Sequence, residues 1–425
     1  MPKKALIVTY YWPPAGGPGV QRWLKFVKYL PDFNIIPIVY VPKNPSYPII
    51  DLSLLDEVPG EATIIKQPIN EPYKFANFLS RKHSKTISSG IIPKEKKQSL
   101  VEKLMLYVRG NYFIPDARKA WVNPSVNFLS DYIKKEGIHT IITTGPPHSL
   151  HLIGMRLKEQ LEIRWLADFR DPWTTIGYHK KLKLTKSSQK KHRDMERKVL
   201  ETADLIVVTS ENTKMEFTSK TNQSVVVVTN GYDEHHLPQS YKDDKFTIAH
   251  IGSLLSERNP KNLWEILNEI IAENSEFESH FQLKLIGVVS EVVLEDIHQN
   301  GLKGYINLLG YVNHDEALLE QRKSQLLLLA EIDSEDTKAI IPGKLFEYMV
   351  TETPILAIGP KDSDVERIIQ NTNTGTYFYY DSREGLKSQI LMYFDAYKQN
   401  ALKTHPTGLK PYSRRELTRK LSELI

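Results

Sequence analysis

A lysine and a glutamate, Lys344 and Glu347, stand three residues apart near the start of a segment with a helical pattern. Side chains at this spacing share one helix face, so the two either form an ion pair or face a common ligand. The ammonium group could meet a phosphate, and the carboxylate could accept hydrogen bonds from both hydroxyl groups of a ribose. The pair is therefore a candidate nucleotide site.

A second set of candidate residues follows strands of the same half. Gly252 and Ser253 end one expected strand, and Arg258 stands just before the next helix. A glycine turn, a basic side chain and a helix N-terminus together suit a diphosphate. Tyr311 and Val312 end a later strand, where an aromatic face and backbone groups could meet a planar base.

The N-terminal half offers two loops of a similar kind. Gly16 and Gly17 lie between the first expected strand and a helix, and such glycines let backbone amides approach an anion. The loop has neither the dinucleotide fingerprint nor a P-loop ending, so a tight turn without a ligand is an equal reading. His148 follows another strand just before a helix, and this position favours a role in a site.

Two acids and an arginine, Asp168, Arg170 and Asp171, cluster after a further strand of the first half. We expect this loop on the acceptor side of a site built from strand ends. The arginine between the two acids argues against a metal-binding carboxylate pair, and we expect no metal ion.

Short apolar runs alternate with helical patterns along the whole chain, and most of the runs are apolar on both faces, as buried parallel strands are. Strands are expected at residues 5–9, 35–41, 62–66, 139–143, 164–168, 205–209 and 225–228, and again at 247–251, 282–287, 306–309, 325–329, 354–358 and 376–380. This alternation predicts two doubly wound α/β domains facing across a cleft. We expect an N-terminal domain over 1–235, with an irregular insertion at 43–122, a C-terminal domain over 236–400, and a segment 401–425 that packs back on the first domain.

The composition sets outer limits. The chain has 425 residues, 40% of them hydrophobic, and no cysteine, which excludes a disordered chain, a disulfide scaffold and thiolate metal sites. No stretch approaches about 20 apolar residues, and the N-terminus lacks the pattern of a signal peptide. We therefore expect a soluble, cytoplasmic protein.

The net charge of +5 is unevenly spread, since residues 179–198 carry +7 and residues 81–97 carry +5. Such segments are either solvated or meet an anionic partner: a membrane surface, nucleic acid or a polyphosphate. Nucleic acid is not expected, because stacking aromatic residues do not alternate with these charges. Residues 91–114 add apolar groups beside lysines, which favours a peripheral contact with an anionic membrane.

Taken in order, these motifs resemble the GT-B glycosyltransferases of the retaining family 4 type, over nearly the whole chain. The motifs are Gly16-Gly17, Asn230-Gly231 before the linker, Gly252-Ser253 with Arg258, Gly310-Tyr311-Val312, and Lys344-Leu345-Phe346-Glu347-Tyr348. The resemblance implies that Arg258 and Lys344 hold the diphosphate of a nucleotide-sugar donor and that Glu347 holds its ribose. It also implies that His148 lies near the transferred sugar, and it requires neither a metal nor a cofactor.

One position departs from this family. A second glutamate normally stands eight residues before the ribose-binding one, and here that residue is Ala339, with Glu331, Asp333, Glu335 and Asp336 nearby. The expected function is transfer of a sugar, with retention, to a glycan or lipid-linked glycan during cell-surface polysaccharide biosynthesis. The alternatives are a GT-B nucleotide-sugar epimerase and a non-catalytic protein that binds a nucleotide sugar or a polyanion.

Overall fold

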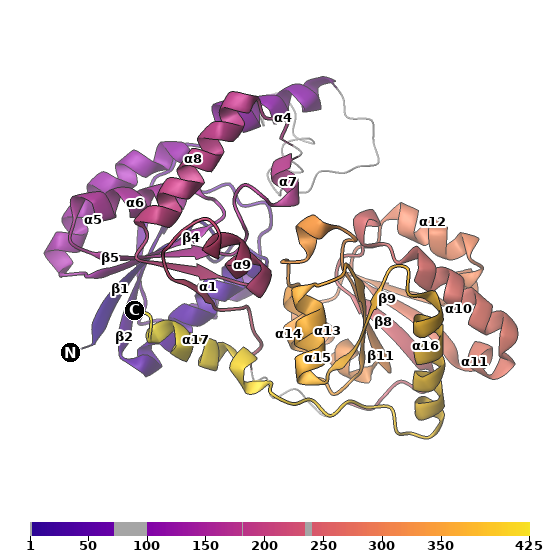
Figure 1. Cartoon of the computed structure of the whole chain (residues 1–425). Coiled ribbons are helices and arrows are strands. Elements are labelled where there is room, and N and C mark those ends of the chain that lie inside the picture. Colours follow the sequence, from indigo (N-terminus) through magenta and orange to yellow (C-terminus); the bar gives the residue numbers. More distant parts are fainter. Residues whose placement is uncertain (1, 72–99, 181, 234–239) are drawn as a thin grey trace. The chain divides into compact units, whose positions relative to one another are not determined.

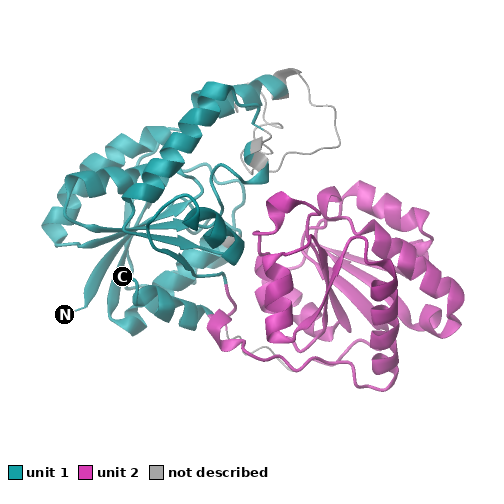
Figure 2. Ribbon diagram, viewed as in Figure 1, with its two compact units in different colours: residues 1–230, 414–425 teal, residues 231–413 magenta. Residues whose placement is uncertain are grey.

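The computed structural model describes residues 2–71, 100–180, 182–233 and 240–425. The chain forms two compact units, shown in Figure 2. The N-terminal unit comprises Met1–Asn230 and Arg414–Ile425, and the C-terminal unit comprises Gly231–Ser413. The first part of the N-terminal unit thus ends at Asn230, a few residues before the expected boundary at 235. The C-terminal segment that belongs to this unit begins at Arg414, later than the expected start at 401.

The N-terminal unit is built on a fully parallel sheet of seven strands in the order β3-β2-β1-β4-β5-β6-β7 (Figure 1). The strands are β1 (Lys3–Val8), β2 (Ile35–Pro42), β3 (Thr63–Gln67), β4 (Thr140–Gly145), β5 (Arg164–Phe169), β6 (Leu205–Val208) and β7 (Val225–Val227). Buried apolar side chains pack on both faces of this sheet, as a parallel sheet between two helix layers requires.

The described helices of this unit flank the sheet or lie at one end of the unit (Figure 1). They are α1 (Pro18–Tyr29), α4 (Leu100–Tyr112), α5 (Val122–Glu136), α6 (Ser149–Gln160), α7 (Gly177–Lys180), α8 (Lys186–Thr202), α9 (Glu211–Thr218) and the C-terminal α17 (Arg414–Ser422). Helix α17 packs on α1, and Arg414 donates a hydrogen bond to Gln21 at 3.0 Å. The last residues of the chain are therefore part of the N-terminal unit.

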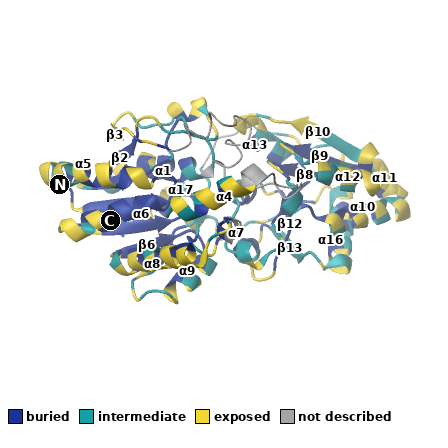
Figure 3. Ribbon diagram, turned by 90° about the horizontal axis from the view of Figure 1, so that it is seen from above, coloured by how far each residue is buried: buried dark blue, intermediate teal, exposed yellow. Residues whose placement is uncertain are grey.

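The C-terminal unit repeats the design with six parallel strands in the order β10-β9-β8-β11-β12-β13. The strands are β8 (Phe246–Ile251), β9 (Phe281–Ile286), β10 (Ile306–Gly310), β11 (Leu326–Ala330), β12 (Ile355–Gly359) and β13 (Gly375–Tyr379). The helices are α10 (Lys261–Glu273), α11 (Ser275–His280), α12 (Glu291–Gln299), α13 (His314–Lys323), α14 (Gly343–Tyr348), α15 (Asp364–Thr372) and α16 (Arg383–Lys398). Figure 3 shows buried strands within more exposed helices.

The strand order reverses once in each sheet, between β1 and β4 and between β8 and β11. At such a reversal the loops after the two strands diverge to opposite faces, and the crevice between them is where doubly wound sheets bind ligands. Gly17, His148, Gly252 and Glu331 each lie in the loop that follows one of these four strands. The topology therefore positions the predicted site residues.

All thirteen expected strands are present, which confirms the doubly wound α/β class. The prediction did not resolve α8, the helix within the basic segment 179–198. Its buried stripe includes Ser188, His192 and Glu196, so the helix lacks the apolar periodicity that sequence analysis detects.

The other basic segment, 81–97, and the lysines of residues 91–97 lie outside the described residues. No described helix combines the length and the apolar character that a membrane span requires.

Candidate functional site

Lys344 and Gly252 meet at the reversal point of the C-terminal sheet. Gly252 follows β8 with a φ of 109°, and a Cβ atom built there would lie 2.8 Å from the Lys344 Nζ atom. The same Nζ atom lies 3.2 Å from Nε2 of His250. The other ring nitrogen of His250, Nδ1, lies 3.1 Å from the Leu328 carbonyl oxygen, and Nε2 also lies 3.4 Å from the Ser253 carbonyl oxygen. A glycine is thus required where the ammonium group approaches the turn.

Lys344 is a cation without a carboxylate partner among the ion pairs of the described residues. Burial and, to a smaller extent, nearby Arg258 lower its pKa to about 7, against the opposing influence of Glu347. The expected sharing of a ligand by Lys344 and Glu347 therefore fits better than a tight ion pair between them. A partly buried ammonium group without a carboxylate partner among the described residues is suited to an incoming anion, because the anion would favour its charged form.

Arg258 ends the short 3-10 helix Ser256–Arg258, and the largest charge effect on it comes from Glu331, which follows β11. Burial lowers the pKa of Arg258, and the charge of Glu331 opposes this. Glu331 accepts hydrogen bonds from Tyr377 at 2.7 Å and Ser363 at 3.0 Å. Burial raises the pKa of Glu331 to about 7.

The carboxylate of Glu331 is therefore fully engaged inside the protein. A sequence reading could name this residue only as one acid among four near Ala339, since Tyr377 stands 46 positions away along the chain. The other three, Asp333, Glu335 and Asp336, lie closer to solvent.

The remaining donor-side candidates differ in what their side chains can reach. Glu347 accepts a hydrogen bond from Gln321 of α13 at 3.1 Å. Tyr311 is 87% exposed, so its ring is free to stack on a planar group. Val312 packs against the core, and Leu345 lies fully within it, so Leu345 could contribute only backbone groups. Ser253 is exposed beside Gly252.

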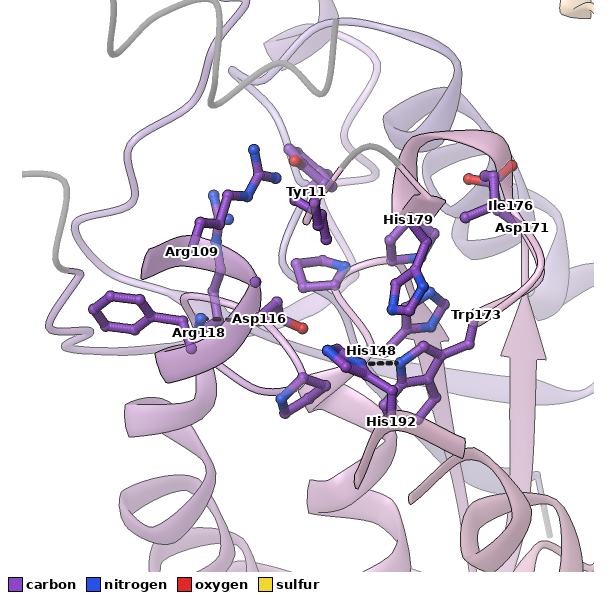
Figure 4. Close-up of a pocket in the computed structure, with 16 residues that line it drawn as sticks. Tyr11, Arg109, Asp116, Arg118, His148, Asp171, Trp173, Ile176, His179 and His192 are labelled. Atoms are coloured by element: carbon purple, nitrogen blue, oxygen red, sulfur yellow. Dashed lines mark hydrogen bonds between the residues drawn. The ribbon is translucent and has the colours of Figure 1, made fainter. Parts of the chain in front are cut away.

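In the N-terminal unit, His148 lies at the N-cap of α6 and lines a cavity of about 320 Å³ (Figure 4). Its ring stacks on Trp173 with centroids 4.8 Å apart and an angle of 3° between the planes. The side chain is buried, and neither ring nitrogen has a hydrogen-bond partner among the described residues. Burial, with help from the neighbouring His151, lowers the pKa of His148 well below its usual value. A neutral imidazole with a free donor and a free acceptor therefore borders the cavity.

Sequence analysis missed most of the other residues around this cavity. Trp173 donates to Nδ1 of His192 at 3.1 Å, and His192 meets His179 edge to face. Burial lowers the pKa of both histidines, that of His179 to about 4. Both lie in the basic segment 179–198, which the sequence analysis interpreted only through its lysines and arginines. Within the described ranges no three His, Asp or Glu side chains are grouped so as to hold a metal ion.

The three residues of the acid-rich loop have different surroundings. Asp168 forms a buried ion pair with Arg22 at 2.8 Å and accepts from Trp23 at 2.7 Å and Thr144 at 2.8 Å. Burial raises the pKa of Asp168, but Arg22 and these donors outweigh burial and lower it. Such an arrangement is that of a structural carboxylate.

Its neighbours lie nearer to the loops. Arg170 donates to the carbonyl oxygens of Gly145 and Pro146, and its guanidinium group packs against Gly19 at the start of α1. Asp171 alone of the three lines the cavity, and burial raises its pKa against the influence of Arg170.

The glycine loop after β1 is partly committed to the fold. The Gly16 amide donates to the Ile49 carbonyl oxygen at 3.1 Å, so it is not free for a ligand. Gly17 has a φ of 100° and open space where a Cβ atom would stand. Of the two predicted glycines, only Gly17 therefore leaves room at the N-terminus of α1.

Several solved structures share this fold over their whole length. Sucrose-phosphate synthase from Thermosynechococcus elongatus matches with a TM-score of 0.62 at 13% identity, covering 99% of this chain and 98% of that one. WaaG, a glycosyltransferase involved in lipopolysaccharide biosynthesis, matches with a TM-score of 0.56 at 12% identity, covering 99% of both chains. A putative UDP-N-acetylglucosamine 2-epimerase from Listeria monocytogenes matches with a TM-score of 0.54 at 12% identity, covering 98% of this chain and 94% of that one.

The fold is therefore GT-B, the two-domain α/β architecture that glycosyltransferases use. The sequence itself matches no protein-family model and no curated protein. At these identities the likeness establishes the architecture, and the activity has to be argued from the site.

Proposed function

We propose that this protein is a glycosyltransferase of the retaining, family 4 type, with its nucleotide-sugar donor in the C-terminal unit. The observation that carries the proposal is the placement of Lys344 and Arg258 at the reversal point of the C-terminal sheet, with Gly252 kept free of a side chain. A doubly wound sheet binds ligands at this edge, and two partly buried cations there match a diphosphate.

The proposed chemistry breaks the bond between the anomeric carbon and an oxygen of the β-phosphate, and it forms a bond from that carbon to an acceptor hydroxyl oxygen. The proton of the hydroxyl passes to the leaving phosphate. Lys344 and Arg258 stabilise the charge that develops on the diphosphate, which is the main contribution a preorganised site can make. In this proposal Glu347 holds the ribose and Tyr311 the base, and the two cations balance the diphosphate without a metal or cofactor.

We place the acceptor in the N-terminal unit, at the cavity bordered by His148 and Asp171. Neutral imidazoles that both donate and accept suit sugar hydroxyl groups, which also do both. The proposed acceptor is a glycan or lipid-linked glycan of cell-surface polysaccharide biosynthesis, met at the inner face of the plasma membrane by a cytoplasmic enzyme. The likeness to WaaG, which acts in lipopolysaccharide biosynthesis, supports this choice.

The proposal is tested first by binding. The melting temperature of the full chain is measured with UDP-, GDP- and dTDP-sugars, and one of these series should raise it. Arg258→Ala should remove that rise while the melting temperature without ligand changes little. If Arg258→Ala lowers the melting temperature without ligand as well as removing the rise with nucleotide sugar, Arg258 serves the fold. That result would contradict the donor site.

The similar epimerase structure gives a second candidate function a specific basis. An epimerase would use the same donor cradle but convert the nucleotide sugar alone. Incubation of the protein with the identified donor and no acceptor separates the two activities: a new nucleotide sugar indicates the epimerase. A donor that binds yet is neither epimerised nor transferred to a panel of glycans would indicate a non-catalytic binding protein.

A further inference from the structure

Helix α4 presents an apolar stripe to solvent. Leu104 is 61% exposed and Tyr112 is 66% exposed, and Tyr107 and Val108 between them are also exposed. Spacings of three, four and eight residues place these side chains along one side of the helix. The opposite side is anchored, because Leu106 is buried and a Cβ atom at Gly110 would lie 2.6 Å from the Leu182 carbonyl oxygen. Exposed side chains of this size in one stripe are characteristic of an interaction surface.

Exposed cations lie beside this stripe, at the start of α8 and in the turn before it. They are Lys183, Lys186, Lys190, Lys191 and Arg193, and none of them takes part in an ion pair with a described residue. The cations further along the helix are paired: Arg197 with Asp194, and Lys198 with Glu159. The unpaired charges are thus confined to the end of α8 that adjoins α4.

Asn111 joins the two elements. Its Nδ2 atom donates to the Lys183 carbonyl oxygen at 3.2 Å, and its Oδ1 atom accepts from the Thr185 amide at 2.8 Å. Thr185 is the N-cap of α8, so α4 and the first turn of α8 form one continuous surface. Both elements lie together at one end of the N-terminal unit in Figure 1. We call residues 104, 107, 108, 112, 183, 186, 190, 191 and 193 the α4–α8 surface.

The cations of this surface lie at the N-terminal end of α8, where the helix dipole makes positive charge unfavourable. The first turn of α8 holds no acid and begins with Lys186, although the N-terminus of a helix attracts negative charge. An external layer of anions would balance both the helix dipole and the cations. Apolar side chains next to such cations match a lipid bilayer, where the stripe enters the acyl boundary and the cations meet anionic head groups. A soluble polyanion would use the cations and leave the stripe exposed.

We propose that the α4–α8 surface docks this protein on an anionic lipid bilayer. The inference deepens the proposed function, since it locates the contact through which a lipid-linked acceptor would be reached, but the contact itself needs no sugar. Each Lys or Arg near an anionic membrane strengthens binding about fivefold. Removing three of the cations should therefore weaken binding by about two orders of magnitude at low salt.

The test is co-sedimentation of the full chain with phosphatidylcholine vesicles, with and without phosphatidylglycerol. The cation variant is Lys186→Gln/Lys190→Gln/Lys191→Gln, and the stripe variant is Leu104→Gln/Tyr112→Gln. The matched control, Lys303→Gln/Lys361→Gln/Lys403→Gln, removes the same charge from exposed lysines of the C-terminal unit. Wild type and control should bind vesicles that contain phosphatidylglycerol, and both surface variants should bind them poorly.

The melting-temperature rise with the donor is measured for every variant, so that a failure of docking is distinct from a failure of the donor site. Three results would overturn the inference: no binding by the wild type, an equal loss in the control, or full binding by the stripe variant. The last result would show that the cations alone hold the protein on the vesicles and that the stripe does not enter the bilayer.

Discussion

The Nζ atom of Lys344 lies 3.2 Å from the Nε2 atom of His250 and makes no ion pair with a described carboxylate. Desolvation and the charge of nearby Arg258 favour the neutral form of this group, so the pKa of Lys344 falls to about 7. The free protein thus holds a partly neutral lysine where the proposal places a diphosphate. This relationship makes donor binding sensitive to pH.

Nucleotide affinity should fall as the pH rises above about 7, by up to tenfold per pH unit, because binding then requires Lys344 to take up a proton. Calorimetry with UDP in buffers of different ionisation enthalpy would measure this uptake. In Lys344→Met the affinity should be low and the proton uptake absent. The lowered pKa also affects folding: the unfolded chain binds the extra proton between about pH 7 and 10.5, so this residue adds stability as the pH rises through that range. Uptake that persists in Lys344→Met would assign it to another group.

Gly252→Ala should weaken nucleotide binding more than it weakens the fold. The new methyl group would stand 2.8 Å from the Lys344 Nζ atom, and the φ of 109° is unfavourable for any residue with a side chain. Gly304→Ala is the matched control, since no atom lies within 4 Å of the position of its Cβ atom. Isothermal titration and thermal melting of both variants would check the prediction. Equal nucleotide affinity in the two variants would show that the Gly252 turn does not border the ligand.

Glu347→Ala should lower the affinity for the donor and abolish transfer while the protein stays folded. The carboxylate accepts a hydrogen bond from Gln321 within the described part of the chain, and charged hydrogen bonds to a ribose would each contribute about 1.5–3 kcal/mol. Glu295→Ala removes an exposed carboxylate of α12 and serves as the control. Wild-type affinity for the donor in Glu347→Ala would show that the ribose is held elsewhere.

Asp168→Asn should lower the free energy of unfolding. Removing the charge leaves Arg22 buried without its partner, and breaking a buried ion pair costs about 3–5 kcal/mol. The lowered pKa of Asp168 means that its stabilising contribution is present above the pKa of an unfolded aspartate and is lost as the pH falls through the native value. Urea unfolding near neutral and acidic pH would show that the difference in the free energy of unfolding between wild type and variant becomes smaller in acid. An unchanged midpoint with altered acceptor kinetics would instead place Asp168 in the acceptor site.

The sequence revealed the fold more completely than the site, and particular residues show why. Buried parallel strands such as β11, Leu326–Ala330, are continuous apolar runs, and a run of that kind is readable without any knowledge of its neighbours. Arg258 was predicted because it stands in a strand-to-helix turn, which the alternation locates, and Lys344 because it stands three residues before Glu347 near the start of a helix. The bond between Glu331 and Tyr377 joins separate strands, and no local pattern signals it. The stacking of His148 on Trp173 likewise depends on how two loops pack.

His148→Phe separates the packing role of this residue from its proposed role in catalysis. A phenyl ring keeps the stacking on Trp173 and removes two buried ring nitrogens that lack partners, each of which costs free energy in the native state. The free energy of unfolding should therefore stay the same or rise by about 1 kcal/mol. Transfer should nevertheless be lost, because the nitrogens that would contact the sugar or acceptor are gone. His151→Phe is the contrasting variant: its Nδ1 atom bonds to the Thr143 hydroxyl at 2.9 Å, so we expect it to lose stability. Urea unfolding and single-turnover transfer measured on both variants would decide, and a stable His148→Phe protein with full activity would mean that His148 only packs.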